Sequence, residues 1–207
     1  RIYPILCQRL EEKGALGWRH EEWAVTTAQA QKPVAVNEYY LRIKSLWKLN
    51  ARQQYALQLL CGWRETEARE RNIPRGRVLK DAACFEIARQ SPSDNSHLGR
   101  IKEVSPGCVR RYGDTILGLL AQARDAADSL LPPPAPRPLT PSQTQLYKDM
   151  KGVAEQLASE LDIAPEVFVK KRDFEEIIRT GLLPSTLSSW RKPLIGDKLL
   201  MLGDKKI

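Results

Sequence analysis

The feature that most constrains this chain is a proline-rich segment between two helix-forming stretches. Residues 131–138 read Leu-Pro-Pro-Pro-Ala-Pro-Arg-Pro and hold five prolines. Proline lacks an amide hydrogen and its ring fixes φ, so the segment is incompatible with a helix and favours extended polyproline geometry. We therefore predict a semi-rigid linker over residues 131–140 that separates two folded parts.

Both sides of this linker show the residue spacing of helices. Apolar residues recur every three or four positions, most clearly after Asn50, a residue type favoured at the start of a helix. An earlier helix over residues 18–31 is predicted to end at Pro33. No stretch shows the sustained two-residue alternation of a half-buried strand. The predicted fold class is all-α, with two small helical-bundle domains in tandem preceded by a helical N-terminal extension.

The two predicted bundles also repeat one another. Moving the second back by 90 positions aligns it with the first without gaps over about twenty-five residues, with equal spacing of helix breaks and apolar positions. Identical pairs include Ala68 with Ala158, Lys80 with Lys170, and Ile87 with Ile177. The alignment predicts a duplicated domain. The predicted segments are the extension at residues 1–47, domain 1 at 48–130, the linker at 131–140 and domain 2 at 141–207.

Several runs of residues resemble a known family. Leu57–Arg64, Ala68–Pro74 and Ile87–Pro92 resemble the HRDC domain, which occurs in ribonuclease D and in RecQ-type helicases, and the run after Trp63 is closer to the ribonuclease D form. Lys171–Ile178 resembles the equivalent helix of ribonuclease D's second module. Ile2–Leu6 resembles the helix that follows the last catalytic motif of its nuclease domain. The chain therefore resembles the C-terminal region of ribonuclease D.

This resemblance implies a parent 3′–5′ exoribonuclease that acts on structured RNA such as tRNA precursors. The family's nuclease binds two metal ions through four carboxylates, beginning with an Asp-x-Glu pair on a strand. No predicted strand here carries that pair, so we expect this chain to have no catalytic residues, metal or other cofactor of its own. An upstream nuclease domain would use Mg²⁺ or Mn²⁺. No apolar run is long enough for a membrane helix, and a cytoplasmic location is expected.

The candidate nucleic-acid-binding residues are cations, in a chain whose formal net charge is +8. They occur around one helix break, at the matching place in the second copy, and beside Tyr112: Arg69, Arg71, Arg75, Arg77 and Lys80; Lys170, Lys171 and Arg172; Arg110 and Arg111. Such side chains bind phosphates, the main source of nucleic-acid affinity. The alternative interpretation is a solvated charged loop, because carboxylates are interspersed. Tyr112 suits a core position better than a base-stacking one.

Two other functions stay open. The modules could form a protein-interaction scaffold that docks on the nuclease domain or on another chain. They could also be a helicase-type DNA-binding module, although helicases of that class usually carry one HRDC copy. A continuous basic surface favours RNA binding, whereas exposed apolar faces favour the scaffold.

Overall fold

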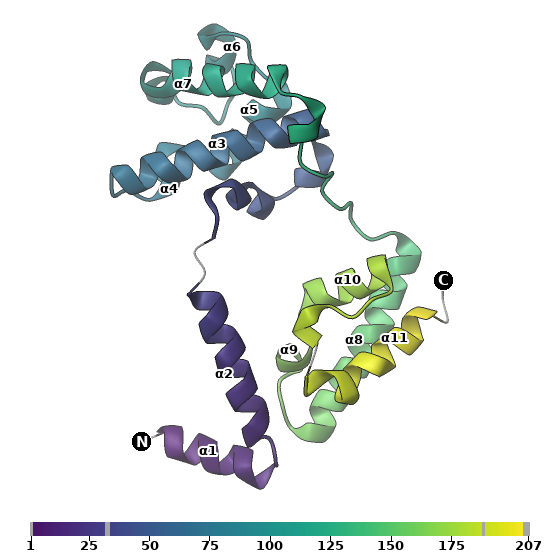
Figure 1. The fold of residues 1–207 in the computed structure, drawn as a ribbon. Coiled ribbons are helices and arrows are strands. Elements are labelled where there is room, and N and C mark those ends of the chain that lie inside the picture. The colour runs from purple at the N-terminus through teal and green to yellow at the C-terminus, as the bar shows by residue number, and fades with distance from the viewer. Residues whose placement is uncertain (1, 32–33, 188, 205–207) are drawn as a thin grey trace. The chain divides into compact units, whose positions relative to one another are not determined.

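The computed structural model describes residues 2–31, 34–187 and 189–204, and these residues form helices and connecting turns without a strand. The all-α prediction is confirmed for this part of the chain. The chain divides into two compact units (Figure 1). We call Thr27–Arg137 the central unit, and Arg1–Thr26 with Pro138–Ile207 the terminal unit. The predicted helix end at Pro33 lies outside the described residues.

The central unit is built on one long helix. Its elements are η1 (Val36–Arg42), η2 (Leu46–Lys48), α3 (Ala51–Glu70), α4 (Arg75–Val78), α5 (Asp81–Gln90), α6 (Asn95–Gly99), α7 (Pro106–Asp125) and η3 (Asp128–Leu130). Helix α3 begins as predicted at Asn50, whose side chain accepts a hydrogen bond from the Gln53 amide at 2.9 Å while the Gln53 side chain accepts one from the Asn50 amide at 3.0 Å. This reciprocal cap satisfies two amides that would otherwise lack partners at the helix start.

The core of the central unit lies between α3, α5 and α7. Leu57, Leu60, Ile87 and Ile116 are fully buried there. Each such side chain stabilises the fold by about 1.5–3 kcal/mol relative to an exposed one. Residues 36–49 also pack on this core, with Tyr40, Ile43 and Leu46 buried. The predicted extension at residues 1–47 is therefore divided, because its second half packs with the central unit.

The terminal unit combines the start of the chain with its end. Its elements are α1 (Ile2–Glu12), α2 (Leu16–Ala30), α8 (Pro141–Leu161), α9 (Pro165–Phe168), α10 (Lys171–Thr180), η4 (Ser185–Leu187), the π-helical turn η5 (Lys192–Gly196) and α11 (Asp197–Asp204). Trp18 of α2 stacks on Trp190 with ring centroids 4.7 Å apart. Arg191 lies over the Trp190 ring at 4.3 Å and pairs with Glu22 of α2 at 2.6 Å. These contacts attach α2 to the rest of the unit.

The two units share local backbone geometry at the spacing of 90 residues. Helices α9 and α10 begin and end 90 positions after α4 and α5. The turn that follows the preceding helix contains a left-handed residue in both units, with φ of 47° at Asn72 and 50° at Asp162. The next amide then bonds back to Ala68 in one unit and to Ala158 in the other, each at 3.0 Å. The sequence alignment thus places equivalent turns at equivalent positions.

Candidate nucleic-acid interface

The candidate cations of the central unit come from the end of α3, from α4 and from the start of α7. Arg69 and Arg71 lie at the end of α3, Arg75 and Arg77 on α4, Lys80 immediately before α5, and Arg110 and Arg111 in the first turns of α7. All seven side chains are exposed. They divide into one group around Glu65, one around Tyr112, and three further cations, Arg77, Lys80 and Arg110.

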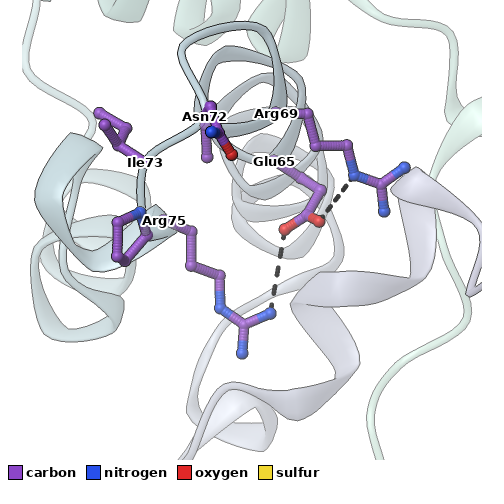
Figure 2. A pocket seen from close by; sticks show the side chains of 7 residues that line it. Glu65, Arg69, Asn72, Ile73 and Arg75 are labelled. Atoms are coloured by element: carbon purple, nitrogen blue, oxygen red, sulfur yellow. Dashed lines mark hydrogen bonds and ion pairs between the residues drawn. The ribbon is translucent and has the colours of Figure 1, made fainter.

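Arg69 and Arg75 converge on Glu65 (Figure 2). The Arg69 Nε lies 2.9 Å from Glu65 Oε1, and the Arg75 Nη1 lies 3.9 Å from Glu65 Oε2. Both arginines also contact Tyr39 of η1: Arg69 donates to its hydroxyl at 3.1 Å, and the Arg75 guanidinium lies 5.5 Å from its ring centroid. The hydrogen bonds that Arg69 donates to Glu65 and Tyr39 raise the pKa of Arg69. The two cations are thus held in fixed positions.

A groove of about 570 Å³ opens beside these arginines at the junction of α3 and α4. Ala68, Ile73 and Pro74 give it apolar surface, and the polar residues lining it are Glu65, Arg69, Asn72 and Arg75 (Figure 2). The arginine side chains are about half exposed, at 55% for Arg69 and 42% for Arg75, whereas that of Glu65 is only 12% exposed. The groove therefore presents cations above an apolar surface.

Tyr112 organises the second group from inside the core. Its side chain is buried and packs edge-on against Trp63 at 5.2 Å, as expected for a core residue. Arg71 donates a hydrogen bond to the Tyr112 hydroxyl and one to Glu67 at 3.5 Å. The Arg111 guanidinium lies 6.0 Å from the Tyr112 ring. Because the ring is buried, it serves to position these arginines rather than to stack on a base.

Four of the candidate cations of the central unit make no ion pair in the described structure: Arg77, Lys80, Arg110 and Arg111, the last of which lies against Tyr112. Among the ion pairs formed by the described residues, none includes Arg77, Lys80 or Arg110. Their charge is therefore not neutralised locally. These side chains are available to bind phosphates without first breaking an internal pair.

The candidate cations of the terminal unit surround the start of α10. Lys170, Lys171 and Arg172 are exposed there, and Lys171 lies 3.7 Å from Glu175. Asp173 follows them and is 3% exposed. Its carboxylate accepts hydrogen bonds from the Lys170 amide at 2.8 Å and from the Thr186 hydroxyl at 2.7 Å. This buried carboxylate fixes the backbone from which the three cations extend.

A buried arginine fixes the corresponding helix start in the central unit. Arg64 is 2% exposed, and its Nη1 donates to the Leu79 carbonyl at 2.9 Å and to Asp81 at 2.6 Å. Arg64 is therefore a structural residue. Cys61 and Cys84 lie beside it, and the pKa of the Cys84 thiol is well above its ordinary value because of its hydrogen bond with Cys61 and its burial. A thiol held in the protonated form is a poor nucleophile.

Two further properties limit the chemistry of the described part of the chain. Its described His, Cys, Asp and Glu residues form no group of three or more that could hold a metal ion. None of its described helices combines the length and the apolar character that a bilayer crossing requires.

Comparison with known proteins agrees with this geometry. Residues 53–120, within the central unit, match the model of the HRDC domain family. This part of the chain is similar to HRDC domains. The ribonuclease D of Pseudomonas paraeruginosa is 34% identical over 97% of this chain and 54% of its own length. That of Gluconacetobacter diazotrophicus is 32% identical over 100% of this chain and 53% of its own length.

Solved structures show the same relationship. A crystal structure described as Escherichia coli RNase D, an exoribonuclease involved in structured RNA processing, is 25% identical and matches with a TM-score of 0.85 over 99% of this chain and 57% of that chain. A protein from Bifidobacterium adolescentis, 16% identical with a TM-score of 0.53, shares the fold. These matches show that the chain is similar to ribonuclease D relatives and that its central unit contains a region similar to the HRDC domain. The chain spans about half the length of the curated relatives it matches.

The comparisons do not test the second HRDC copy or the individual binding residues. The HRDC match covers residues of the central unit, so a second HRDC copy in the terminal unit stays a prediction. The binding roles of individual cations also stay predictions. Sequence reasoning missed Tyr39 and Glu65, which hold two of the candidate arginines. A Glu65–Arg69 pair at i,i+4 was detectable in the sequence, whereas the contact with Tyr39 joins residues 30 positions apart.

Proposed function

We propose that this chain is the nucleic-acid-binding region of a ribonuclease D-like 3′–5′ exoribonuclease. It positions structured RNA, in particular the 3′ ends of tRNA precursors, for a nuclease domain elsewhere in the same protein. The similarity to ribonuclease D relatives and the exposed cations of the central unit support this role. Under this proposal the second copy is also HRDC-like, the parent protein requires Mg²⁺ or Mn²⁺, and it acts in the cytoplasm.

The observation that carries the proposal is that three exposed cations near the start of α5 and of α7 make no ion pair in the described structure. Arg77, Lys80 and Arg110 are exposed and bind no carboxylate in the described structure. Phosphate contacts provide sequence-independent affinity and position a nucleic acid. The ion pair between buried Arg64 and exposed Asp81, at 2.6 Å, fixes the start of α5 beside Lys80. Fixed cations suit recognition of RNA by its shape and backbone.

The test is the salt dependence of RNA binding. Arg77, Lys80 and Arg110 are changed together to alanine, and affinity for a 3′-extended tRNA is measured across a salt series. Each lost phosphate contact removes roughly 0.7–0.9 released counterions, so the slope of log affinity against log salt should flatten by about two to three units. The control changes Arg100, Lys102 and Arg124, three other exposed cations of the same unit. Equal losses in both variants would mean that only net charge matters.

We also propose that this chain does not itself cut RNA. The proposal rests on the absence from its sequence of a strand bearing the Asp-x-Glu pair of the family's nuclease. A labelled 3′-extended tRNA incubated with the chain and either Mg²⁺ or Mn²⁺ should stay intact on a gel. Shortening that persists after repurification of the protein would contradict the proposal.

A protein-docking function is the second candidate, and one surface favours it. Helices α1 and α2 expose large apolar side chains, between 50% and 73% accessible: Ile2, Tyr3, Ile5, Leu6, Trp23 and Val25. Exposed apolar groups of this kind mark interaction surfaces. If the scaffold function were the main one, the triple cation variant would keep full RNA affinity, whereas Trp23→Ser would reduce the activity of the full-length nuclease.

A further inference from the structure

The groove at the α3–α4 junction has a counterpart in the terminal unit, and the two differ in charge. At the spacing of 90 residues, Glu65 corresponds to Glu155, Arg69 to Ser159, Asn72 to Asp162 and Arg75 to Pro165. The left-handed residue has φ of 47° in one unit and 50° in the other. The backbone turn is therefore shared, but its side chains differ. Serine and proline replace the two arginines, and a carboxylate replaces the amide.

In the terminal unit this position is occupied by a cation from the chain itself. The Lys13 Nζ donates to Asp162 Oδ2 at 2.7 Å, to the Asp162 carbonyl at 3.1 Å and to the Leu161 carbonyl at 3.4 Å. The lysine satisfies carbonyls at the end of α8 and pairs with the nearby carboxylate. Its hydrogen bond and charge also lower the pKa of Asp162. The acidic version of the junction thus binds a positive group.

In the central unit the corresponding position is open and has the opposite charge. Two arginines outnumber the single carboxylate of Glu65 along the groove, and Asn72 is neutral. The arginine side chains remain about half exposed despite their contacts with Glu65 and Tyr39. A junction that binds a cation when acidic should bind an anion when basic. A phosphate is the anion that the proposed function supplies.

The apolar surface of the groove points to more than a phosphate. Ala68, Ile73 and Pro74 line it, and about 570 Å³ exceeds what a phosphate group requires. The Arg75 guanidinium lies 5.5 Å from the ring centroid of Tyr39, and the Arg75 side chain is 42% exposed, so this planar group is only partly covered. Nucleobases pack on apolar and guanidinium surfaces when they are not stacked within a duplex. A paired base would not reach this surface.

We propose that the α3–α4 groove binds one unpaired nucleotide of a single-stranded RNA segment. Its phosphate contacts Arg69 and Arg75, and its base packs against Ile73, Pro74 and the Arg75 guanidinium. This inference rests on the proposed RNA-binding function and assigns a single-stranded subsite to it. The cations without ion pairs, Arg77, Lys80 and Arg110, then bind phosphates of the flanking RNA.

The repeat supplies a variant that should leave the fold intact. Asn72→Asp introduces aspartate at a position whose counterpart in the terminal unit, Asp162, is already aspartate with nearly the same φ. It therefore adds a negative charge to the groove without straining the turn. Asp162→Asn makes the opposite change in the terminal unit and is the matched control. Arg75→Lys keeps the charge but removes the planar guanidinium, which separates base stacking from phosphate attraction.

The measurement is fluorescence anisotropy of an end-labelled RNA titrated with the whole chain. One RNA is a single-stranded oligoadenylate of about twelve nucleotides, and the other is a duplex of the same length. We expect the single strand to bind on the order of tenfold more tightly than the duplex. Asn72→Asp should lower single-strand affinity roughly five- to tenfold at low salt, and Asp162→Asn should leave it unchanged. Arg75→Lys should lower it on the order of tenfold with little change in salt slope.

The outcomes separate this inference from the proposed function. Unchanged single-strand binding by Asn72→Asp and Arg75→Lys, with helix content equal to the parent by circular dichroism, would overturn the groove assignment and leave RNA binding intact. If the variants lost equal affinity for the single strand and for the duplex, the groove would contact phosphate only, and the proposal that it binds an unpaired base would be wrong. Failure of the unaltered chain to bind either RNA would overturn the proposed function itself.

Discussion

The central and terminal units fix the same helix start with different buried groups. In the central unit, Arg64 of the long helix reaches the Leu79 carbonyl and Asp81 at the beginning of α5. In the terminal unit, the residue aligned with Arg64 is Ala154, and Asp173 of α10 bonds instead to the Lys170 amide and to Thr186. Both groups are almost fully buried, at 2% and 3% exposure.

This difference shows which part of the repeated frame is required and which part is exchangeable. The apolar positions of the turn and of the following helix are filled in both units, for example by Ile87 and Ile177. The polar group that fixes the helix start has moved to another element and changed sign. A buried polar group requires partners but not a particular position, so its location can change while the apolar frame stays.

The largest effect should come from Arg64→Ala in the central unit. This change removes two hydrogen bonds and leaves a cavity between α3 and α5. Because Asp81 is 58% exposed and can be solvated, we expect the free energy of unfolding to fall by about 3 kcal/mol, which is less than the largest losses seen for buried ion pairs. Urea unfolding measures it. Arg89→Ala, which removes a surface pair with Glu86, is the control and should leave stability unchanged.

A smaller effect is expected from Trp18→Ala in the terminal unit. Trp18 stacks on Trp190 but is only half-buried, so its removal should lower the free energy of unfolding by about 2 kcal/mol. Protection of α2 from proteolysis should fall while the central unit is unaffected. If instead the central unit unfolds at lower urea concentration in this variant, the division into two independently packed units is wrong.

Asp173→Ala should cost about 1–2 kcal/mol, less than Arg64→Ala. It leaves the Lys170 amide and the Thr186 hydroxyl without their acceptor, but removes a smaller side chain. Asp173→Asn keeps one carbonyl acceptor and should recover part of the loss. Thermal unfolding followed by circular dichroism gives the order of the variants. A larger loss for Asp173→Ala than for Arg64→Ala would reverse the comparison between the units.

The smallest effect should come from Lys13→Ala. Its partner Asp162 is exposed, and the pKa of that carboxyl is lowered by Lys13. A carboxyl whose pKa is lower in the folded state contributes stability above its unfolded pKa, about 3.9, and loses it as pH falls through the lower folded value. The parent should therefore exceed the variant slightly at neutral pH, and the difference should disappear in acid. A difference that grows on acidification would contradict the pairing.

Much of the fold follows from local sequence signals. The caps at Asn50 and Ser105 are visible as residue types, and the structure forms both hydrogen bonds, at 2.9 Å and 3.2 Å. The spacing of 90 residues aligns the turns that the structure forms at Asn72 and Asp162. These signals are readable because caps and left-handed turns depend on a few neighbouring residues.

The candidate site was less predictable, because its geometry depends on distant contacts. In the sequence, Arg69, Arg75 and Arg77 belong to one basic run. In the structure, Tyr39 and Glu65 contact Arg69 and Arg75, whereas Arg77 makes no ion pair. The packing of α2 against Trp190 joins residues more than 160 positions apart. No local pattern reports such contacts, and the charge of a residue does not show whether it is already paired.

The left-handed residue at the end of α3 and α8 has a consequence for how such a repeat diverges. Asparagine and aspartate both tolerate this conformation, and they differ by an amide in place of a carboxylate. An exchange between them changes the charge of a surface without altering the turn beneath it. After a duplication, one copy can therefore acquire a new ligand while the other turns its junction into an internal contact. Selection on binding can then act on the residue in one copy while selection on folding acts on its counterpart in the other.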